Sequence, residues 1–443
     1  MKKIIALLLA LAMVFALAAC SSSGDKTPEN SNTPDPSTPV ESNTPDTSDA
    51  PETSDTPEVK LDTENPFLIG HIADLTGNEA STGSLAQKSV EFAAELINAA
   101  GGIAGREVQV ITKDAQSNSA TAADVARQLI EDDGVNVIVG PTQISHKQTV
   151  AAVVAELGVP AIYYNGTPAF LFKKYEYLFS SGGGTAQMPT AMADYLYNEL
   201  GLRTIYTITQ EGTAGDNYVN PLSENFKAMG GTVVADIRVP ADGTDISSYL
   251  QNVGEADALV GWLSGTQGVN LWTSWYDLGI SERMPLYGAV HGGFTDYFIW
   301  LQLSKSRPEV VDKALEWGVY APINYAYSIE NDENTAFVEQ WKAENEGKVP
   351  VGSNLPGAGY TALMMIKVAA ESIDGEITSE ALYEALQNTS VTAAEGHSSF
   401  GDGNRIAVKD VYIVKVVKLD DGSFNYEVVD TYNDVPVNGL TVG

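Results

Sequence analysis

Apolar runs typical of buried strands alternate with longer amphipathic patterns typical of helices from Phe67 almost to the end of the chain. The first cycle has a strand-like run at 67–73 and a helical pattern at 85–100, which stops at two glycines. Successive strand–helix–strand units place their strands parallel in one sheet and cover that sheet with their helices. The alternation therefore restricts the chain to the α/β class.

The expected elements fall into two series. The second series starts after the glycine run at 182–184, which predicts two α/β lobes with a few crossings between them. The remaining expected strands are 108–112, 135–139, 161–164, 204–209, 232–239, 258–262, 285–287 and 318–321; the remaining helices are 120–133, 145–157, 187–200, 217–229, 266–278, 335–346, 354–371 and 379–386. A β-hairpin of 410–419 and 423–431 is expected to turn at Asp420-Asp421-Gly422.

A lipoprotein signal is predicted at residues 1–20. Lys2 and Lys3 precede sixteen uncharged, mostly apolar residues, which fit a secretory signal and fall short of the roughly 20 residues that span a bilayer. The closing Leu-Ala-Ala-Cys resembles the lipobox of bacterial lipoproteins, in which the cysteine is lipidated and becomes the new N-terminus. Cys20, the only cysteine of the chain, is the expected lipidation site. An ordinary signal peptide that happens to contain a cysteine is the alternative.

Residues 21–66 have the composition of a tether. They carry 8 of the 20 prolines, many Ser, Thr and Asn, 11 acidic residues and only two lysines. Such a segment cannot bury enough apolar surface to offset the entropy of ordering it, and its prolines and like charges favour extension. We expect a disordered acidic spacer that holds a globular body away from the membrane.

Composition and motifs argue against several function classes. The chain has 58 acidic and 25 basic residues, and phosphate neutralisation needs clustered Lys and Arg, so no nucleic-acid partner is expected. One cysteine excludes an intramolecular disulfide and a thiolate metal cluster. The sequence has no phosphate loop, zinc helix or nucleophile elbow, and its four histidines share no ligand spacing. We therefore expect a protein that is not an enzyme and has no metal and no cofactor.

Several sequence blocks resemble those of one known family. The most specific is Ile97-Asn98-Ala99-Ala100-Gly101-Gly102-Ile103-Ala104-Gly105-Arg106, which follows Leu75-Thr76-Gly77 and precedes a strand ending at Asp114. The runs 135–141, with Ser145 after it, and 158–162 continue the pattern. Together they resemble the extracytoplasmic substrate-binding proteins of ABC importers, in the Leu/Ile/Val-binding protein group. The resemblance is strongest over 67–170 and covers nearly all of the globular region.

This resemblance implies the periplasmic binding protein type I fold, with two doubly wound, Rossmann-like lobes joined by three hinge strands. The expected division gives 67–181 plus 320–398 to lobe 1, and 182–319 plus 399–443 to lobe 2. The lobes would close on a ligand held between them. In open α/β sheets ligands bind beyond the carboxyl ends of the strands, so the contacts should lie in loops that follow strands.

In lobe 1 the resemblance places a ligand carboxylate against hydroxyl and backbone N–H groups of two loops. By position, the candidate contacts of this lobe are Ser81, Thr82, Gln143, Ile144, Ser145, Asn165, Gly166 and Thr167. Ile144 replaces a hydroxyl-bearing residue of the family, which leaves Gln143 and Ser145 to compensate. Simple N-capping by Ser145, and a turn role for Thr167, are the alternatives.

In lobe 2 two positions depart from the family pattern. Ala214 stands where the family usually has an aromatic residue, and Gln267 where it has the acid that meets the ligand's ammonium. An amide cannot neutralise an ammonium as a carboxylate does, so Asp216 or Glu211 is an alternative acid. His291 follows a strand and is a further candidate, with a surface position as its alternative.

The sequence thus predicts a lipid-anchored, extracytoplasmic receptor that delivers a small polar ligand to an ABC permease. The resemblance makes a branched-chain amino acid the first candidate ligand. The alternative is a ligand sensor on the same fold, for amides, urea-like compounds or carboxylates, that serves a regulator rather than a permease. Apart from its N-terminal lipid, the protein is expected to have no contact with the membrane.

Overall fold

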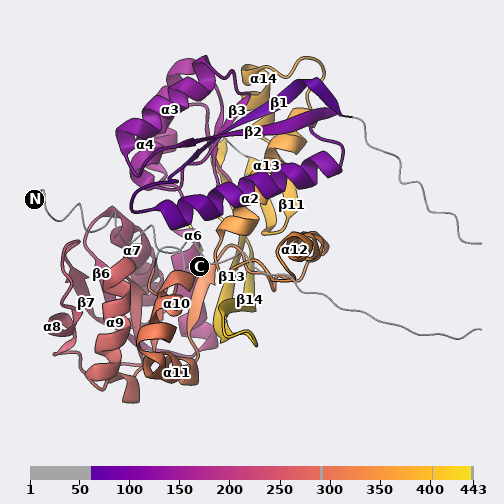
Figure 1. Ribbon diagram of the computed structural model, residues 1–443. Coiled ribbons are helices and arrows are strands. Elements are labelled where there is room, and N and C mark those ends of the chain that lie inside the picture. The colour runs from indigo at the N-terminus through magenta and orange to yellow at the C-terminus, as the bar shows by residue number, and fades with distance from the viewer. Residues whose placement is uncertain (1–60, 290–292, 402, 441–443) are drawn as a thin grey trace, which may run out of the picture. The chain divides into compact units, whose positions relative to one another are not determined.

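The computed structural model describes residues 61–289, 293–401 and 403–440 (Figure 1). The predicted signal, Cys20 and most of the predicted tether lie outside the described residues, as does His291. No helix in the described part is long and apolar enough to cross a membrane. The described strands form two separate sheets, a large one of ten strands and a small one of four.

The parallel part of the large sheet has the order β2-β1-β3-β4-β5. Its strands are β1 (Asp62–Ala73), β2 (Arg106–Asp114), β3 (Val137–Val139), β4 (Ala161–Tyr163) and β5 (Leu178–Ser180), connected by α2 (Ala80–Ala99), α3 (Ser119–Glu131), α4 (Ile144–Leu157) and α5 (Phe170–Lys174). Buried side chains of α3 and α4 pack on one face, and those of α2 pack on the other. This sheet is therefore doubly wound.

The small sheet has the order β7-β6-β8-β9, with all strands parallel. It consists of β6 (Thr204–Gln210), β7 (Thr232–Val239), β8 (Ala258–Trp262) and β9 (Leu286–Gly288). One face is covered by α6 (Gln187–Asp194), which continues into a π-helical turn at Tyr195–Glu199, and by α7 (Thr213–Ala228). The other face is covered by α8 (Ile246–Leu250), α9 (Gly265–Asp277), a 3₁₀ turn at Ile280–Glu282, α10 (Tyr297–Ser306) and α11 (Pro308–Trp317).

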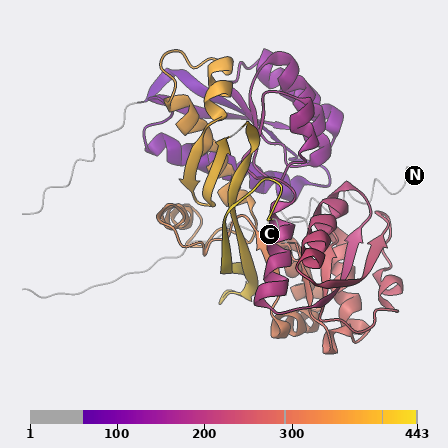
Figure 2. The same cartoon turned by 180° about the vertical axis from the view of Figure 1, so that it is seen from behind.

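The C-terminal elements connect the two parts. They are β10 (Tyr320–Ile323), α12 (Asp332–Glu344), α13 (Leu355–Glu371), α14 (Ser379–Leu386), β11 (Ser390–Ala393), β12 (Gly396–Gly401), β13 (Asn404–Lys418) and β14 (Phe424–Val435). The start of β13 pairs with β5, whereas Val411 and Ile413 further along pack with α6 and the small sheet. Figures 1 and 2 show the long β13–β14 hairpin beside α6. On the other side, α13 and α14 share a core with α2.

The structure confirms the expected α/β class and most expected elements. The bounds of β7, β8 and α14 agree with the predicted ranges, and the hairpin turn is closed by a hydrogen bond from Leu419 N to Ser423 O. The first strand begins at Asp62 rather than Phe67. The short elements α5, β5, α8, β11 and β12, and the helices α10 and α11, were not expected. The division of the chain between lobes, at the expected residue boundaries, stays a prediction.

Candidate functional site

A small cavity, of about 130 Å³, lies where loops from both sheets meet. Four of its eleven lining residues come directly after the carboxyl ends of parallel strands or open the helix that follows: Ile144 comes after β3, Gly166 after β4, Ala214 after β6 and Ala289 after β9. This is the place where open α/β sheets bind ligands. The full lining is Ile144, Gly166, Thr185, Met188, Pro189, Ala214, Asn217, Tyr218, Trp262, Ala289 and Pro322.

The start of α4 forms part of the wall made by the large sheet. The helix begins at Ile144, and its N-cap is Gln143, whose side chain makes no capping bond. Ser145 therefore lies in the first turn, and the alternative role considered for it, N-capping of the helix, is wrong. Free N–H groups and the helix dipole make such a helix start favourable for an anion.

A buried lysine holds the loop after β4 through hydrogen bonds. The Nζ of Lys147 donates to the carbonyls of Asn165 and Gly166, both at 3.0 Å, and to Oγ1 of Thr167 at 3.2 Å. Lys147 has no exposed surface, and burial holds the pKa of its amine well below the ordinary value. In the described part no carboxylate forms an ion pair with it.

Thr167 belongs to the support of this loop rather than to the cavity lining. It is fully buried, its Oγ1 donates to Asn165 O at 2.9 Å, and its N–H donates to Gly183 O at 3.2 Å. The side-chain amide of Asn165 donates to Thr142 O at 3.0 Å. Of the three predicted loop residues, Gly166 alone is part of the described lining.

A second predicted contact region, at the start of α2, does not reach the cavity lining. Ser81 is exposed, Thr82 is half-buried, and neither is among the lining residues. The helix can approach the end of β1 because residue 83 is a glycine: a Cβ there would lie 2.0 Å from the carbonyl oxygen of Asp74. The carboxylate of Asp74 in turn lies 3.4 Å from His146 Nδ1 in a buried pair.

The wall contributed by the small sheet carries two polar atoms without partners. The hydroxyl of Tyr218 and the Nδ2 of Asn217 are buried, and neither has a hydrogen-bond partner among the described residues. Both side chains come from α7 and line the cavity with Ala214. Buried polar groups of this kind are costly unless something bonds them, which a polar ligand group would do.

Gln267, at the position of the family's acid, and Asp216, one of the two alternative acids, are engaged elsewhere. Asp216 forms an ion pair of 2.6 Å with Arg238. The Nε2 of Gln267 donates to the carbonyls of Pro240 at 2.8 Å and Gly243 at 2.7 Å, so this amide holds the loop after β7. Neither residue is part of the cavity lining.

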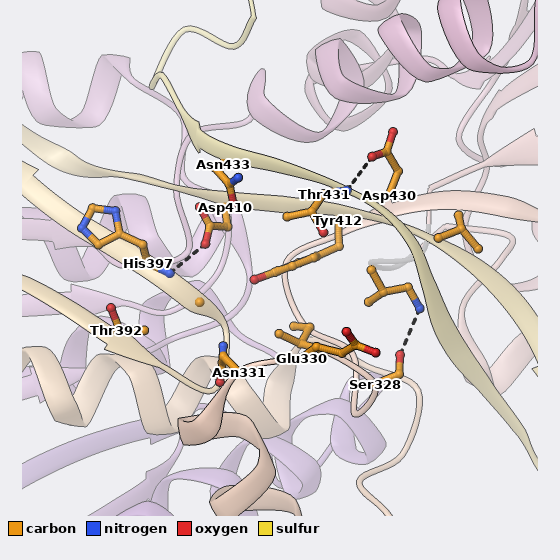
Figure 3. Close-up of a pocket in the computed structure, with 14 residues that line it drawn as sticks. Ser328, Glu330, Asn331, Thr392, His397, Asp410, Tyr412, Asp430, Thr431 and Asn433 are labelled. Atoms are coloured by element: carbon orange, nitrogen blue, oxygen red, sulfur yellow. Dashed lines mark hydrogen bonds between the residues drawn. The ribbon is translucent and has the colours of Figure 1, made fainter.

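A larger hollow, of about 680 Å³, lies on the face of the β11–β14 strands (Figure 3). Several of its polar groups already have partners within the protein: the carboxylate of Asp410, for example, accepts from the backbone N–H groups of His397 and Asp434, both at 2.9 Å. None of the predicted contacts lines it. In the described part no group of three or more His, Cys, Asp or Glu residues could hold a metal ion. The smaller cavity is therefore the better candidate.

Comparison with known proteins decides the family. The family model described as periplasmic binding protein matches residues 66–423. The chain belongs to the periplasmic binding protein family. Its sequence is 23% identical over 339 residues to the Leu/Ile/Val-binding protein homolog 6 of Brucella melitensis, which covers 75% of this chain and 83% of that relative. This membership implies a solute-binding protein of ABC transporter type and an extracytoplasmic location.

Solved structures of the family share the fold. An ABC transporter substrate-binding protein from Sphaerobacter thermophilus is 28% identical, with a TM-score of 0.73 and coverage of 84% of this chain and 98% of that one. A solute-binding protein from Rhodopseudomonas palustris in complex with 3,4-dihydroxybenzoic acid is 23% identical, with a TM-score of 0.71 and coverage of 84% and 98%. A branched-chain amino acid transporter protein from Streptococcus pneumoniae in complex with isoleucine is 24% identical, with a TM-score of 0.66 and coverage of 82% and 99%. They confirm the two-lobed type I fold.

Sequence reasoning missed part of the site. Thr185, Met188 and Pro189 lie on or beside α6, whose place between the sheets no local pattern shows. Asn217 and Tyr218 follow the family glycine at 215 by two and three residues, so the helical period could have placed them near Ala214. Lys147 lies between His146 and Gln148 in the polar first half of α4, so the local pattern gives no signal of its burial.

Proposed function

We propose that this member of the family is a lipid-anchored receptor of an ABC importer, and that it binds a small carboxylate with an apolar body in the 130 Å³ cavity. The observation that carries the proposal is the lining itself. One wall offers N–H groups at the start of α4 and after β4, and the other offers apolar surface with two unpartnered polar atoms. A ligand with an anionic end and an apolar body would match these two walls.

The ligand class includes the branched-chain amino acids that the family resemblance implies, and amine-free carboxylates. Relatives on this fold bind isoleucine and 3,4-dihydroxybenzoic acid, and both are carboxylic acids. No carboxylate belongs to the described lining, and Asp216 is paired with Arg238. This favours the amine-free carboxylates, because an ammonium without a counter-charge would lose hydration without compensation.

The mechanism is differential binding to a hinged molecule. A ligand that touches groups of both walls makes all of its contacts only when the lobes are closed, so it shifts the hinge equilibrium toward the closed form. The permease would then recognise that form. Cys20 carries the lipid in this proposal, and the acidic segment after it forms the tether. The protein performs no chemistry on its ligand.

The test is a binding screen of the mature chain, residues 20–443, purified in detergent. We expect benzoate, 4-methylpentanoate or leucine to raise the thermal midpoint in a dose-dependent way, since a ligand at 100 times its dissociation constant stabilises by about 2.7 kcal/mol. Calorimetry would give the dissociation constants. A response to sugars or neutral amides alone, with none to any carboxylate, would refute the proposed ligand class.

A further inference from the structure

Lys147 is a buried lysine that the fold places directly behind the ligand cavity. Its ammonium lies 3.0 Å from the carbonyl oxygen of Gly166, and Gly166 lines the cavity. All three of its hydrogen bonds go to neutral acceptors of the loop after β4. The lysine is fully buried, and no carboxylate in the described part pairs with it. Burying a charge without a counter-charge is costly, so the position calls for an explanation.

We propose that Lys147 supplies the positive charge that makes this receptor select anionic ligands, acting through the peptide group between Asn165 and Gly166. This inference rests on the proposed function, because it assigns a role at that same cavity. It makes Lys147 a positioning residue for the ligand's carboxylate.

The peptide geometry explains how the charge reaches the cavity. The carbonyl of Asn165 accepts a hydrogen bond from Lys147, and in a trans peptide the next N–H points the opposite way. The Gly166 N–H therefore points away from Lys147, on a residue that lines the cavity, and no hydrogen bond of the described part uses it. Hydrogen bonds in a chain polarise one another, so the ammonium strengthens this N–H as a donor to an anion.

The pKa of the Lys147 amine is lowered, as expected for a buried amine that has no counter-charge among the described residues. Burial is the cause, and an anion a few ångströms away would reverse part of the shift. Around it, the adjacent His146 is paired with Asp74, and the Tyr163 phenol donates to the Lys147 carbonyl at 2.9 Å. Glu79 is a further acid near that pair, and both burial and the charge of Asp74 raise its pKa.

The charge should discriminate between a carboxylate and its neutral carboxamide. An opposite charge within about 4–6 Å changes a pKa by 1–3 units, and by linkage the ligand gains the same factor in affinity. Replacing Lys147 with Gln keeps hydrogen-bond donors under the loop and removes the charge. We expect the K147Q substitution to weaken carboxylate binding by at least about tenfold and to change carboxamide binding by less than about threefold.

The experiment measures two ligand pairs by calorimetry on the mature chain: benzoate with benzamide, and 4-methylpentanoate with 4-methylpentanamide. The matched control is Lys173→Met, which removes the same charge from an exposed position on α5. It should leave the ratio of carboxylate to carboxamide affinity at the wild-type value. A K147Q protein that keeps the wild-type ratio would overturn this inference alone.

A second measurement needs no variant, in case K147Q fails to fold. The wild-type affinity for benzoate should fall as pH rises through the lowered pKa of Lys147, because the anion loses its counter-charge there, whereas benzamide affinity should stay flat. Equal pH profiles for the two ligands from pH 6 to 10 would overturn the inference. If wild type binds carboxamides and no carboxylate, the proposed ligand class fails and this inference with it.

Discussion

The buried ion pair between Lys409 and Glu395 offers a sharp test of how the C-terminal strands are held. Lys409 Nζ lies 3.0 Å from Glu395 Oε2, and the two side chains are 0% and 1% exposed. The lysine also donates to Ser181 O at 3.3 Å, in the segment after β5. Removing one partner of a buried pair costs about 3–5 kcal/mol, because the other charge is left in the interior without compensation.

We therefore expect Lys409→Met to lower the free energy of unfolding by about 3–5 kcal/mol at pH 7, measured by urea denaturation. Adding Glu395→Met should recover most of that loss, since a buried pair replaced by apolar residues is often neutral. Lys418→Met, at the exposed end of the same strand, is the control and should change stability by less than about 0.5 kcal/mol.

The stability lost in Lys409→Met should depend on pH, and the pKa of Glu395 gives the direction of that dependence. Burial raises the pKa of Glu395 above its ordinary value, and removing Lys409 takes away the main group that opposes that rise. A carboxyl whose pKa is raised on folding destabilises the native state above its unfolded pKa of about 4.5 and ceases to do so below it. The single variant should thus lose more stability at pH 8 than at pH 5. A loss under 1 kcal/mol at pH 7, or one that grows as pH falls, would refute the reasoning.

Three further predictions concern the site and its supports. Gln267→Met should lower the free energy of unfolding by about 1–3 kcal/mol in urea denaturation, because the carbonyls of the loop after β7 lose their donor. Its affinity for carboxylates should stay within about threefold of wild type. A loss of affinity with an unchanged free energy of unfolding would contradict this prediction. Tyr218→Phe should change the free energy of unfolding by less than about 0.5 kcal/mol, since its hydroxyl has no partner among the described residues. It should weaken binding of the tightest ligand severalfold in calorimetry. An unchanged affinity would show that the hydroxyl does not contact the ligand. Gly261→Ala should destabilise strongly in thermal denaturation, because a Cβ there would lie 1.7 Å from the carbonyl oxygen of Ile208 on the neighbouring strand; a midpoint within about 2 °C of wild type would contradict it.

Local pattern was enough for much of the fold. The period of the apolar residues placed α3, α13, β6 and β8 within a few residues, because each of these elements buries one face or both against neighbours. Short elements such as β11 and β12 were not predicted, since four to six residues carry too little periodicity to distinguish a strand from a loop. The start of β1 was not predicted, because residues with the composition of a linker pair with β2 from Asp62 onward.

For the site, the sequence by itself determined which loops matter, because ligands bind at the carboxyl ends of parallel strands and those ends follow from the element order. Ile144 and Gly166 lie in loops found in this way, and the family resemblance supplied Ala214. Which side chains face the cavity was decided only by the tertiary structure. Gln267 bonds backbone carbonyls, Asp216 pairs with Arg238, and Lys147 lies under the loop after β4, all through contacts between segments at least 18 residues apart. Such contacts depend on the packing of whole elements, and a local pattern carries no record of that packing.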